Sequence, residues 1–350
     1  MRALAIFLTW ALGVCVRAFP VWLLWTTPEE PAYLAHVPAL LASATSEVLV
    51  ALSDLRAYPE GTTDPLLFAL KGAKERGAEV YVLLERGPEG PAPERQEAED
   101  LLRRWGIQVR GDHPETPLHA KFLVVDGRLV VVGSTHWTKT ALTRSVQVDV
   151  VVESPELASA FRAFFFRLWE GRLAARAQLP EGPWREPAVL PLLELPESLL
   201  HFQALTRLLD QASRSVLVLL YQCAYYPQYP DSPSTRLLRH LAHGAARGLR
   251  VQVLLEGGEG LREVAEGNRL AAAWLWVQGA EVRLDPLGTT LHAKVLLVDG
   301  RHLVVTSANW TYSGLTRNVE AGVLFWGTPG LAERAAQRFQ ELWARSRPLP

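Results

Sequence analysis

One short motif occurs twice in this chain of 350 residues, and this repetition restricts the fold more than any other feature. The first copy begins at His119 and reads His-Ala-Lys-Phe-Leu-Val-Val-Asp-Gly-Arg. The second begins at His292 and reads His-Ala-Lys-Val-Leu-Leu-Val-Asp-Gly-Arg. Two similar halves in one chain usually pack about a pseudo-twofold axis, as the subunits of a homodimer do. The repeat therefore predicts two related halves, and a monomer that carries both copies.

Each half also repeats one order of secondary structure. An apolar strand is followed by a helix that ends at a glycine, by two further strand-like segments and, after the motif, by an amphipathic helix. These elements are expected at 46–52, 65–76, 79–84, 106–110 and 155–169, and again at 214–220, 234–247, 250–255, 279–283 and 329–343. Alternating strands and helices predict an α/β fold with a mixed, largely parallel sheet in each half.

The length suits two halves of ordinary domain size, which are expected at residues 32–170 and 201–346. Apolar residues make up 49% of the chain, enough to give each half a core. Residues 171–200 are rich in proline and are expected to form a linker or an ordered strap across the surface. Cys223 is the only cysteine after residue 15, so the fold is expected to stand without an internal disulfide.

The N-terminus resembles a targeting segment. After Arg2, residues 3–16 form an apolar run that is too short to span a bilayer alone. Residues 1–18 are therefore expected to be a signal peptide or N-terminal anchor, and the chain to be exported to a secreted or periplasmic location. A second apolar stretch at 18–25 leaves the uncleaved membrane anchor open as the alternative.

The motif is expected to bring together polar side chains from two antiparallel strands of a hairpin. Because side chains alternate along a strand, His119 and Lys121 should project from one face. Asp126 and the following glycine are a strong hairpin signal, so the chain should return antiparallel and bring Ser134 and His136 beside them. The second copy has His292, Lys294, Asp299, Ser307 and Asn309 at the corresponding positions. Imidazole, ammonium and neutral donors together suit a phosphate or phosphodiester.

Other interpretations of these histidines are weaker. A single histidine on a buried strand most often satisfies a hydrogen bond of the core, but a doubled His-x-Lys pattern argues against that explanation. Lysine is scarce in this arginine-rich chain, yet both motifs retain it. A metal site is disfavoured because no carboxylate or cysteine accompanies either histidine at ligand spacing, and no cofactor is expected. Asp126 and Asp299 are expected to fix the turns rather than to contact a substrate.

These segments resemble the His-Lys-Asp motif of the phospholipase D superfamily, over residues 45–170 and 213–345. The resemblance implies a pair of α/β/α sandwiches that meet at one shared active site. It also implies a metal-independent mechanism in which one histidine attacks phosphorus and forms a phosphohistidine. The other histidine protonates the leaving oxygen and then activates water or an alcohol. By family precedent, His119 is the nucleophile and His292 is the acid and base.

The resemblance also implies a set of phosphate-binding side chains and exposes two departures from the family pattern. Residues expected to bind the non-bridging oxygens are Lys121, Lys294, Ser134, Ser307 and Asn309. His136 stands where the family usually has asparagine, and Thr306 stands where glycine is usual. His136 could still donate to a phosphate oxygen, with charge when it is protonated. The alternative is that its own titration competes and makes the activity pH-sensitive.

In both copies, a polar residue stands at the same distance after the motif histidine: Gln147 in the first half and Glu320 in the second. In the family, an acid at this position hydrogen-bonds the catalytic histidine of the opposite half. Glu320 would then orient His119 and stabilise its positive charge, which suits a nucleophile. His292 would receive only the neutral Gln147, which stabilises an imidazolium less and leaves His292 the stronger acid.

The leading hypothesis is an exported enzyme that hydrolyses or exchanges the headgroup of a phospholipid. The aromatic loop 225–230 and the apolar N-terminus fit a substrate at a membrane surface, although packing of the loop against 171–200 explains it equally well. A nuclease acting on nucleic-acid phosphodiesters is the alternative; the short halves favour it and the net charge of −1 disfavours it. A scaffold protein that leaves both His-Lys pairs unused is the non-enzymatic alternative.

Overall fold

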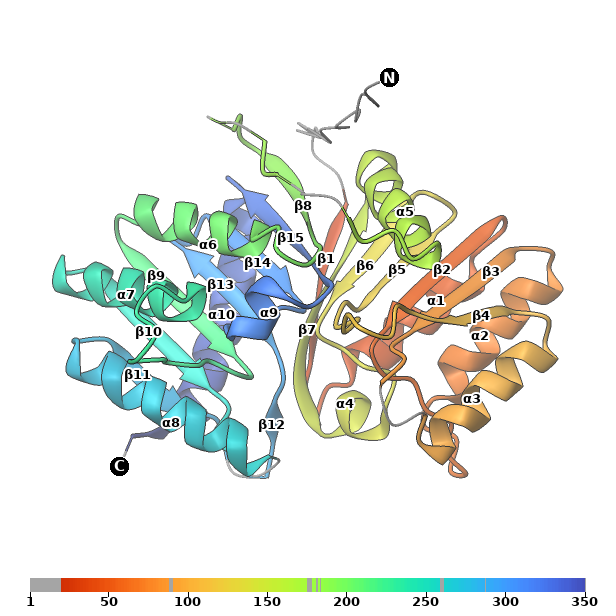
Figure 1. The fold of residues 1–350 in the computed structure, drawn as a ribbon, viewed down its shortest axis with the longest axis horizontal. Helices are drawn as coiled ribbons and strands as arrows, with labels where there is room; N and C mark the ends of the chain where they lie inside the picture. The colour runs from red at the N-terminus through yellow and green to blue at the C-terminus, as the bar shows by residue number, and fades with distance from the viewer. Residues whose placement is uncertain are drawn as a thin grey trace, which may run out of the picture.

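The computed structural model describes residues 20–349, apart from 88–90, 175–177, 181, 183, 259–260 and 287. These residues form two mixed sheets of eight strands each. Figure 1 shows the first half, coloured red to yellow-green, beside the second half, coloured green to blue. The strands and helices expected from the repeat are present, with ends within two residues of the predicted bounds.

The two sheets have related strand orders. In spatial order, the first sheet consists of β1 (Val21–Thr26), β7 (Ser145–Glu153), β6 (Leu129–Gly133), β5 (Phe122–Val125), β2 (Glu47–Leu52), β3 (Glu79–Leu84) and β4 (Gln108–Gly111), with β12 (Thr290–Leu291) also paired to β7. The second consists of β16 (Arg347–Pro348), β11 (Glu281–Leu284), β10 (Arg250–Leu255), β9 (Ser215–Leu220), β13 (Lys294–Val298), β14 (His302–Thr306), β15 (Glu320–Trp326) and β8 (Ala188–Glu194).

The prediction of mixed sheets is confirmed, but the prediction that they are largely parallel is wrong. Apart from the short pairing of β12 with β7, the parallel strands of the described chain are β2, β3 and β4 in the first sheet and β9, β10 and β11 in the second. The motif strands and their neighbours join antiparallel. The physical reason is the two-residue turn, which can connect only antiparallel strands, whereas parallel strands need a crossover connection.

Helices cover both faces of each sheet, as an α/β/α sandwich requires. On the outer face of the first sheet lie α1 (Ala32–Ala42), α2 (Asp64–Glu75) and α3 (Pro93–Arg104), and on that of the second lie α6 (Leu200–Gln211), α7 (Pro233–Ala246) and α8 (Arg262–Val277). The inner faces carry α5 (Pro155–Trp169) and α10 (Pro329–Arg345). Two short helices, α4 (Lys139–Thr143) and α9 (Tyr312–Thr316), follow the motifs.

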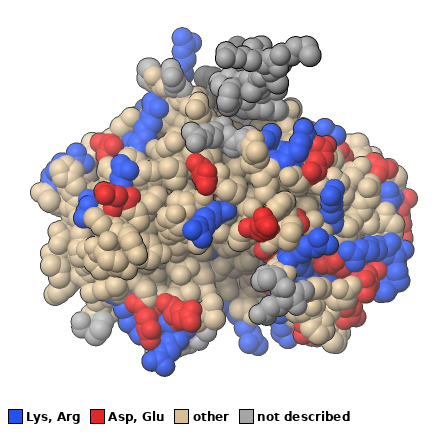
Figure 2. Space-filling view, viewed as in Figure 1, with Lys and Arg blue, Asp and Glu red and all other residues tan. Residues whose placement is uncertain are grey.

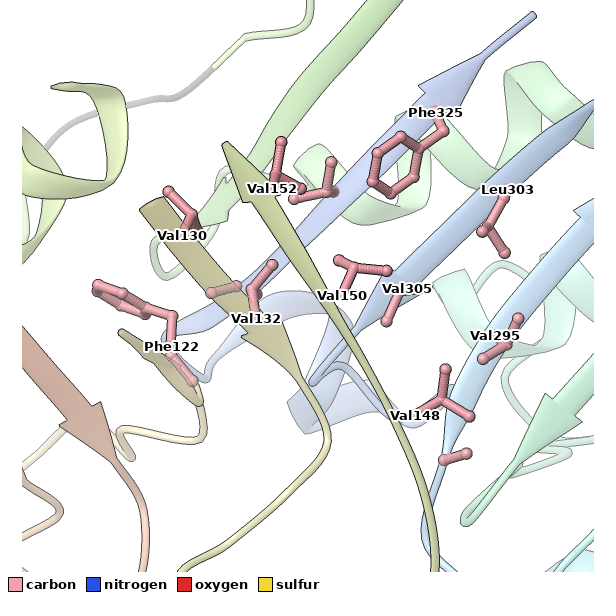
Figure 3. Close-up of a cluster of buried hydrophobic side chains, with 14 of the residues drawn as sticks. Phe122, Val130, Val132, Val148, Val150, Val152, Val295, Leu303, Val305 and Phe325 are labelled. Atoms are coloured by element: carbon pink, nitrogen blue, oxygen red, sulfur yellow. The ribbon is translucent and has the colours of Figure 1, made fainter. Parts of the chain in front are cut away.

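A single apolar cluster joins the inner faces of the two sheets. Val148, Val150 and Val152 of β7 pack in one cluster with Val305 and Phe325 of the second half. Figure 3 shows these side chains converging from both sheets. Burial of apolar surface is the main favourable term in folding, so this shared cluster packs the two halves against each other rather than leaving them joined by a linker alone.

Two segments that lie outside the predicted halves contribute strands to the sheets. The proline-rich segment contributes β8, which pairs with β15 as an edge strand of the second sheet. Val21–Trp25 of the second apolar stretch lies in β1, paired antiparallel with β7. The segment expected to direct export, 1–18, lies outside the described residues. Within the part of the chain that is described, no helix is both long and apolar enough to cross a membrane.

The Asp-Gly turns anchor the motif hairpins to the rest of each half. Asp126 has φ 51° and Gly127 φ 59°, the left-handed pair that a tight two-residue hairpin requires. The Asp126 carboxylate accepts hydrogen bonds from the backbone N–H groups of Thr45, Ser46 and Glu47 at 2.8–3.1 Å. Asp299 accepts the corresponding bonds from residues 213–215. As predicted, these aspartates fix the turns.

Asp126→Ala should lower the free energy of unfolding by about 1–3 kcal/mol, because it leaves several N–H donors without their acceptor. Burial alone would raise the pKa of Asp126, but the hydrogen bonds from residues 45–47 outweigh it and hold the pKa below its ordinary value. The stabilisation is therefore present above the carboxyl's unfolded pKa and is lost as the pH falls through the lower folded value. Urea unfolding of the wild type and Asp126→Ala at several pH values measures this; equal stability at pH 7 would contradict it.

Candidate active site

Each motif histidine is fixed by a backbone contact with the opposite half. The segment before β5 reaches across so that Leu118 pairs with Val319, and the His119 N–H donates to the Val319 carbonyl at 2.9 Å. Correspondingly, β12 pairs with β7, and the His292 N–H donates to the Val146 carbonyl at 2.9 Å. The two motifs are therefore brought together where the halves meet.

Glu320 of the second half holds His119 of the first. Nδ1 of His119 lies 2.9 Å from both carboxylate oxygens of Glu320, which is fully buried. Ser307 and Asn318 also donate hydrogen bonds to this carboxylate. Burial alone would raise the pKa of Glu320, but His119, Lys121 and the hydrogen bond from Ser307 lower it to about 2. Glu320 is thus ionised at neutral pH, so Nδ1 of His119 must be the donor.

Gln147 of the first half holds His292 of the second. Oε1 of Gln147 lies 3.1 Å from Nδ1 of His292 and also accepts a 2.7 Å hydrogen bond from the Ser134 hydroxyl. Both cross-half contacts expected from the sequence are therefore present. They differ in charge, since one histidine meets a carboxylate and the other an amide.

The two histidines differ in basicity as a result. Burial lowers the pKa of His119, while Glu320 acts in the opposite direction. Burial and the adjacent Lys294 lower the pKa of His292 well below its usual value, and no carboxylate of the described residues is in contact to oppose them. The direction agrees with the expectation that His292 is the stronger acid. At neutral pH a neutral His119 keeps a lone pair on Nε2, the form that a nucleophile needs.

The two motif lysines are buried beside the histidines. Nζ of Lys121 donates to the His119 carbonyl, and Nζ of Lys294 lies 2.7 Å from the His292 carbonyl and 3.1 Å from its Nε2. Burial lowers the pKa of Lys121 to about 7 and that of Lys294 well below its usual value. An anionic phosphodiester would favour the charged forms, so substrate binding and lysine protonation are linked.

Ser134 and Ser307 contact the partners of the two histidines. Both are fully buried; their hydroxyls donate to Gln147 and Glu320 and accept backbone N–H bonds from Val148 and Ala321. Their hydroxyl protons are directed at the partners of the histidines, so both serines help to position those partners, and their assignment as phosphate ligands stays a prediction. The amide oxygen of Asn309, by contrast, is buried and has no hydrogen-bond partner among the described residues.

His136 lies between the two motif histidines. Its ring centroid is 6.3 Å from that of His119 and 5.0 Å from that of His292, and its Nδ1 lies 3.1 Å from the Ser53 hydroxyl. Burial and the nearby Lys121 lower its pKa well below the usual value. This direction favours a neutral His136 ring at neutral pH, and donation from His136 to a phosphate oxygen stays a prediction.

Thr306 fits because the glycine of this strand pair stands on the opposite strand in the second half. In the first half Gly133 faces Asp149, whose Cα would lie 2.6 Å from a Cβ at position 133. In the second half Thr306 faces Gly322, where an added Cβ would lie 2.7 Å from that of Thr306. The Thr306 hydroxyl hydrogen-bonds the buried His201 at 2.7 Å. The departure is thus absorbed within the fold.

Sequence reasoning missed two residues at the site. Tyr221 follows β9, and its ring centroid lies 4.6 Å from that of His292 and 5.1 Å from Nζ of Lys294. Ser53 follows β2 and contacts His136. Both stand directly after the strand with which the repeat begins in their half, at the strand end where ligand sites of α/β sheets occur, and this position was the available signal. In the described residues no group of three or more His, Cys, Asp or Glu could hold a metal ion.

Two α/β/α halves that bring doubled His-Lys pairs onto one shared site define a protein of the phospholipase D type. A family model described as "Cardiolipin synthase, PLD-like domain" matches residues 37–169 and 205–343. The chain belongs to this family, and through it to the phospholipase D superfamily of phosphodiesterases.

Individual relatives cover shorter regions. The chain is 38% identical over 71 residues to a mitochondrial cardiolipin hydrolase of Chlamydomonas reinhardtii, which is 20% of this chain and 32% of that protein. It is 36% identical over 78 residues to a 5′-3′ exonuclease of Mus musculus, or 21% and 16% of the two chains. The matches thus span a third or less of these relatives.

A solved structure shares the fold over nearly the whole chain. The phosphatidylserine synthase of Haemophilus influenzae superposes with a TM-score of 0.72 at 15% identity, covering 95% of this chain and 89% of that one. At this identity the likeness concerns the fold alone, and it agrees with the two-half architecture described above.

Proposed function

We propose that the chain is a metal-independent phosphodiesterase that hydrolyses or transfers phospholipid headgroups through a phosphohistidine. The observation that carries the proposal is the pair of cross-half contacts, His119 with Glu320 and His292 with Gln147. They give two histidines of one site different electrostatic partners, as a nucleophile and a general acid require.

In the proposed reaction Nε2 of His119 attacks phosphorus and the bond to the leaving oxygen breaks. The leaving oxygen takes a proton from His292, whose low pKa makes it a strong acid once the anionic substrate favours its protonation. His292 then removes a proton from water or an alcohol, whose oxygen attacks phosphorus and releases His119. Lys121 and Lys294 would neutralise the non-bridging oxygens.

Lipid is favoured over nucleic acid as the substrate. Family relatives named for cardiolipin support this choice, whereas the relative named as an exonuclease supports the alternative. The net charge is −1, and on the face drawn in Figure 2 basic and acidic side chains are interspersed rather than gathered into a basic stripe. Sequence-independent binding to nucleic acid depends on such a stripe.

The test is to incubate the purified chain, with a chelator present, with phosphatidylcholine, phosphatidylglycerol, cardiolipin and plasmid DNA in parallel. We expect release of a headgroup without nicking of DNA, and a transfer product when a primary alcohol is added. Nicking without headgroup release would replace the proposal with the nuclease alternative. A His119→Ala/His292→Ala double variant prepared in the same way controls for contaminating enzymes. Export by the N-terminal segment remains a separate prediction.

A further inference from the structure

In each half, a pair of carboxyl groups lies beside the residue that precedes the motif histidine. Neither pair has a role in the reaction proposed above. In the first half the pair is Glu85, directly after β3, and Asp112, directly after β4. In the second half it is Glu256, directly after β10, and Asp285, directly after β11. The two pairs occupy equivalent places in the repeat, so the same arrangement is seen twice.

Both carboxyls of a pair converge on one backbone N–H group. In the second half, the N–H of Leu291 lies 2.5 Å from Oε2 of Glu256 and 3.2 Å from Oδ2 of Asp285. In the first half, the N–H of Leu118 donates to Glu85, and Asp112 lies in hydrogen-bond contact with Glu85. Leu118 and Leu291 are the residues immediately before His119 and His292.

Two ionised carboxylates so close together would repel each other strongly, and one shared proton removes the repulsion. Glu256 and Asp285 are 2% and 1% exposed, so water screens little of the interaction. Oδ2 of Asp112 is buried and receives no hydrogen bond from an N–H or hydroxyl group of the described residues, which leaves it as the acceptor for a proton held by Glu85.

We propose that each pair shares one proton and, as a positioning device, clamps the backbone before a catalytic histidine. The clamp fixes residue 118 or 291 from within its own half, while the next N–H bonds the opposite half. Each histidine is thereby held from both sides of the junction. The proposal rests on the function proposed above, since positioning is useful only if these histidines react.

The clamp should weaken at alkaline pH. Burial, and then the neighbouring carboxyl, raise the pKa of Glu85 to about 7 and of Asp285 to about 8. When the pH exceeds these pKa values, the pair loses the shared proton, and repulsion between the two carboxylates pushes them apart. The charged or titratable groups facing the first pair are Arg95 and Lys121, and those facing the second are Arg347 and Tyr221. Because the folded pKa lies above the unfolded one, this stabilisation is fully present below the unfolded carboxyl pKa and is lost as the pH rises from there through the folded value.

Matched variants of one pair test the clamp. Asp285→Ala removes it and should lower kcat about 100-fold with KM little changed, because a small displacement of a reacting group is costly. Asp285→Asn can donate its amide N–H to Glu256 in place of the shared proton. It should restore kcat to within a few-fold of the wild type and lessen the loss of activity above pH 8. An Asp285→Asn variant as impaired as Asp285→Ala would overturn the proposal.

Infrared spectroscopy tests the shared proton without relying on turnover. The difference spectrum between the wild type and a Glu85→Gln/Asp285→Asn double variant at pH 6 should contain the C=O band of protonated carboxyl groups. The band should disappear as the pH is raised to 10. Its absence at pH 6 would overturn the proposal, even if Asp285→Ala failed to fold. A wild type without activity on any phosphodiester would instead count against the proposed function, and the band would still report on the pairs.

Discussion

His119→Ala and His292→Ala should each lower kcat for a natural phosphodiester by roughly 10⁴-fold or more, because each removes a group that forms or breaks a bond in the reaction. Neither imidazole can replace the other, since His119 is oriented by Glu320 and His292 by Gln147. Steady-state assays of headgroup release measure the loss. Near-wild-type activity in either variant would refute a site shared between the halves.

A substrate with a nitrophenol leaving group should separate the two roles. Nitrophenolate leaves without a proton, so His292→Ala should release one equivalent of nitrophenol per site in a burst and then stall, because water is no longer activated. His119→Ala should show no burst, since it lacks the nucleophile. A burst from His119→Ala and none from His292→Ala would mean that the assigned roles are reversed.

Glu320→Gln should lower kcat by about 10²–10⁴-fold, although it changes little in size. Ser307 donates to Oε2 and Asn318 to Oε1. Nδ1 of His119 lies 2.9 Å from both oxygens, so the amide nitrogen of the variant takes the place of an oxygen that Nδ1 contacts. The amide N–H group would then face Nδ1 of His119 and select the tautomer with a proton on Nε2, which cannot attack phosphorus. Gln147 avoids this outcome because only Ser134 competes for its oxygen among the side chains described.

The reciprocal variant is the matched control. Gln147→Glu places a carboxylate beside His292 and should raise its pKa. His292 would then stay protonated to higher pH, so the alkaline limb of the plot of kcat against pH should shift to higher pH. A profile unchanged in Gln147→Glu, together with an active Glu320→Gln, would show that these cross-half partners do not tune the histidines.

Much of the fold was predictable because alignment of the two copies of the repeat identifies the corresponding strands and helices of each half. The strands at 79–84 and 250–255 and the helix at 155–169 have the expected bounds, and the Asp-Gly turns gave the hairpins. Strands β1 and β8 were missed for different reasons. The first lies in an apolar run that resembles a targeting segment. The second contains Pro191, which is tolerated because β8 is an edge strand.

The site was predictable as a set of side chains, but less so in its hydrogen bonds. The contacts of His119 and His292 with the opposite half follow from the register of the repeat. The direction of the Ser134 and Ser307 hydroxyls does not, since a serine can donate to a phosphate or to a neighbouring carboxyl or amide with equal ease. The carboxyl pairs were likewise hidden, because Glu85 and Asp112 come together only when β3 and β4 lie side by side.

The most direct test is to locate the covalent intermediate. His292→Ala, incubated with the nitrophenyl substrate and quenched without acid, should gain the mass of one phosphoryl-containing group per chain. Peptide mapping should place this adduct on His119, and His119→Ala/His292→Ala should gain no mass. An adduct on any other residue, or a burst of nitrophenol without an adduct, would contradict an active site in which His119 is the nucleophile and His292 the acid and base.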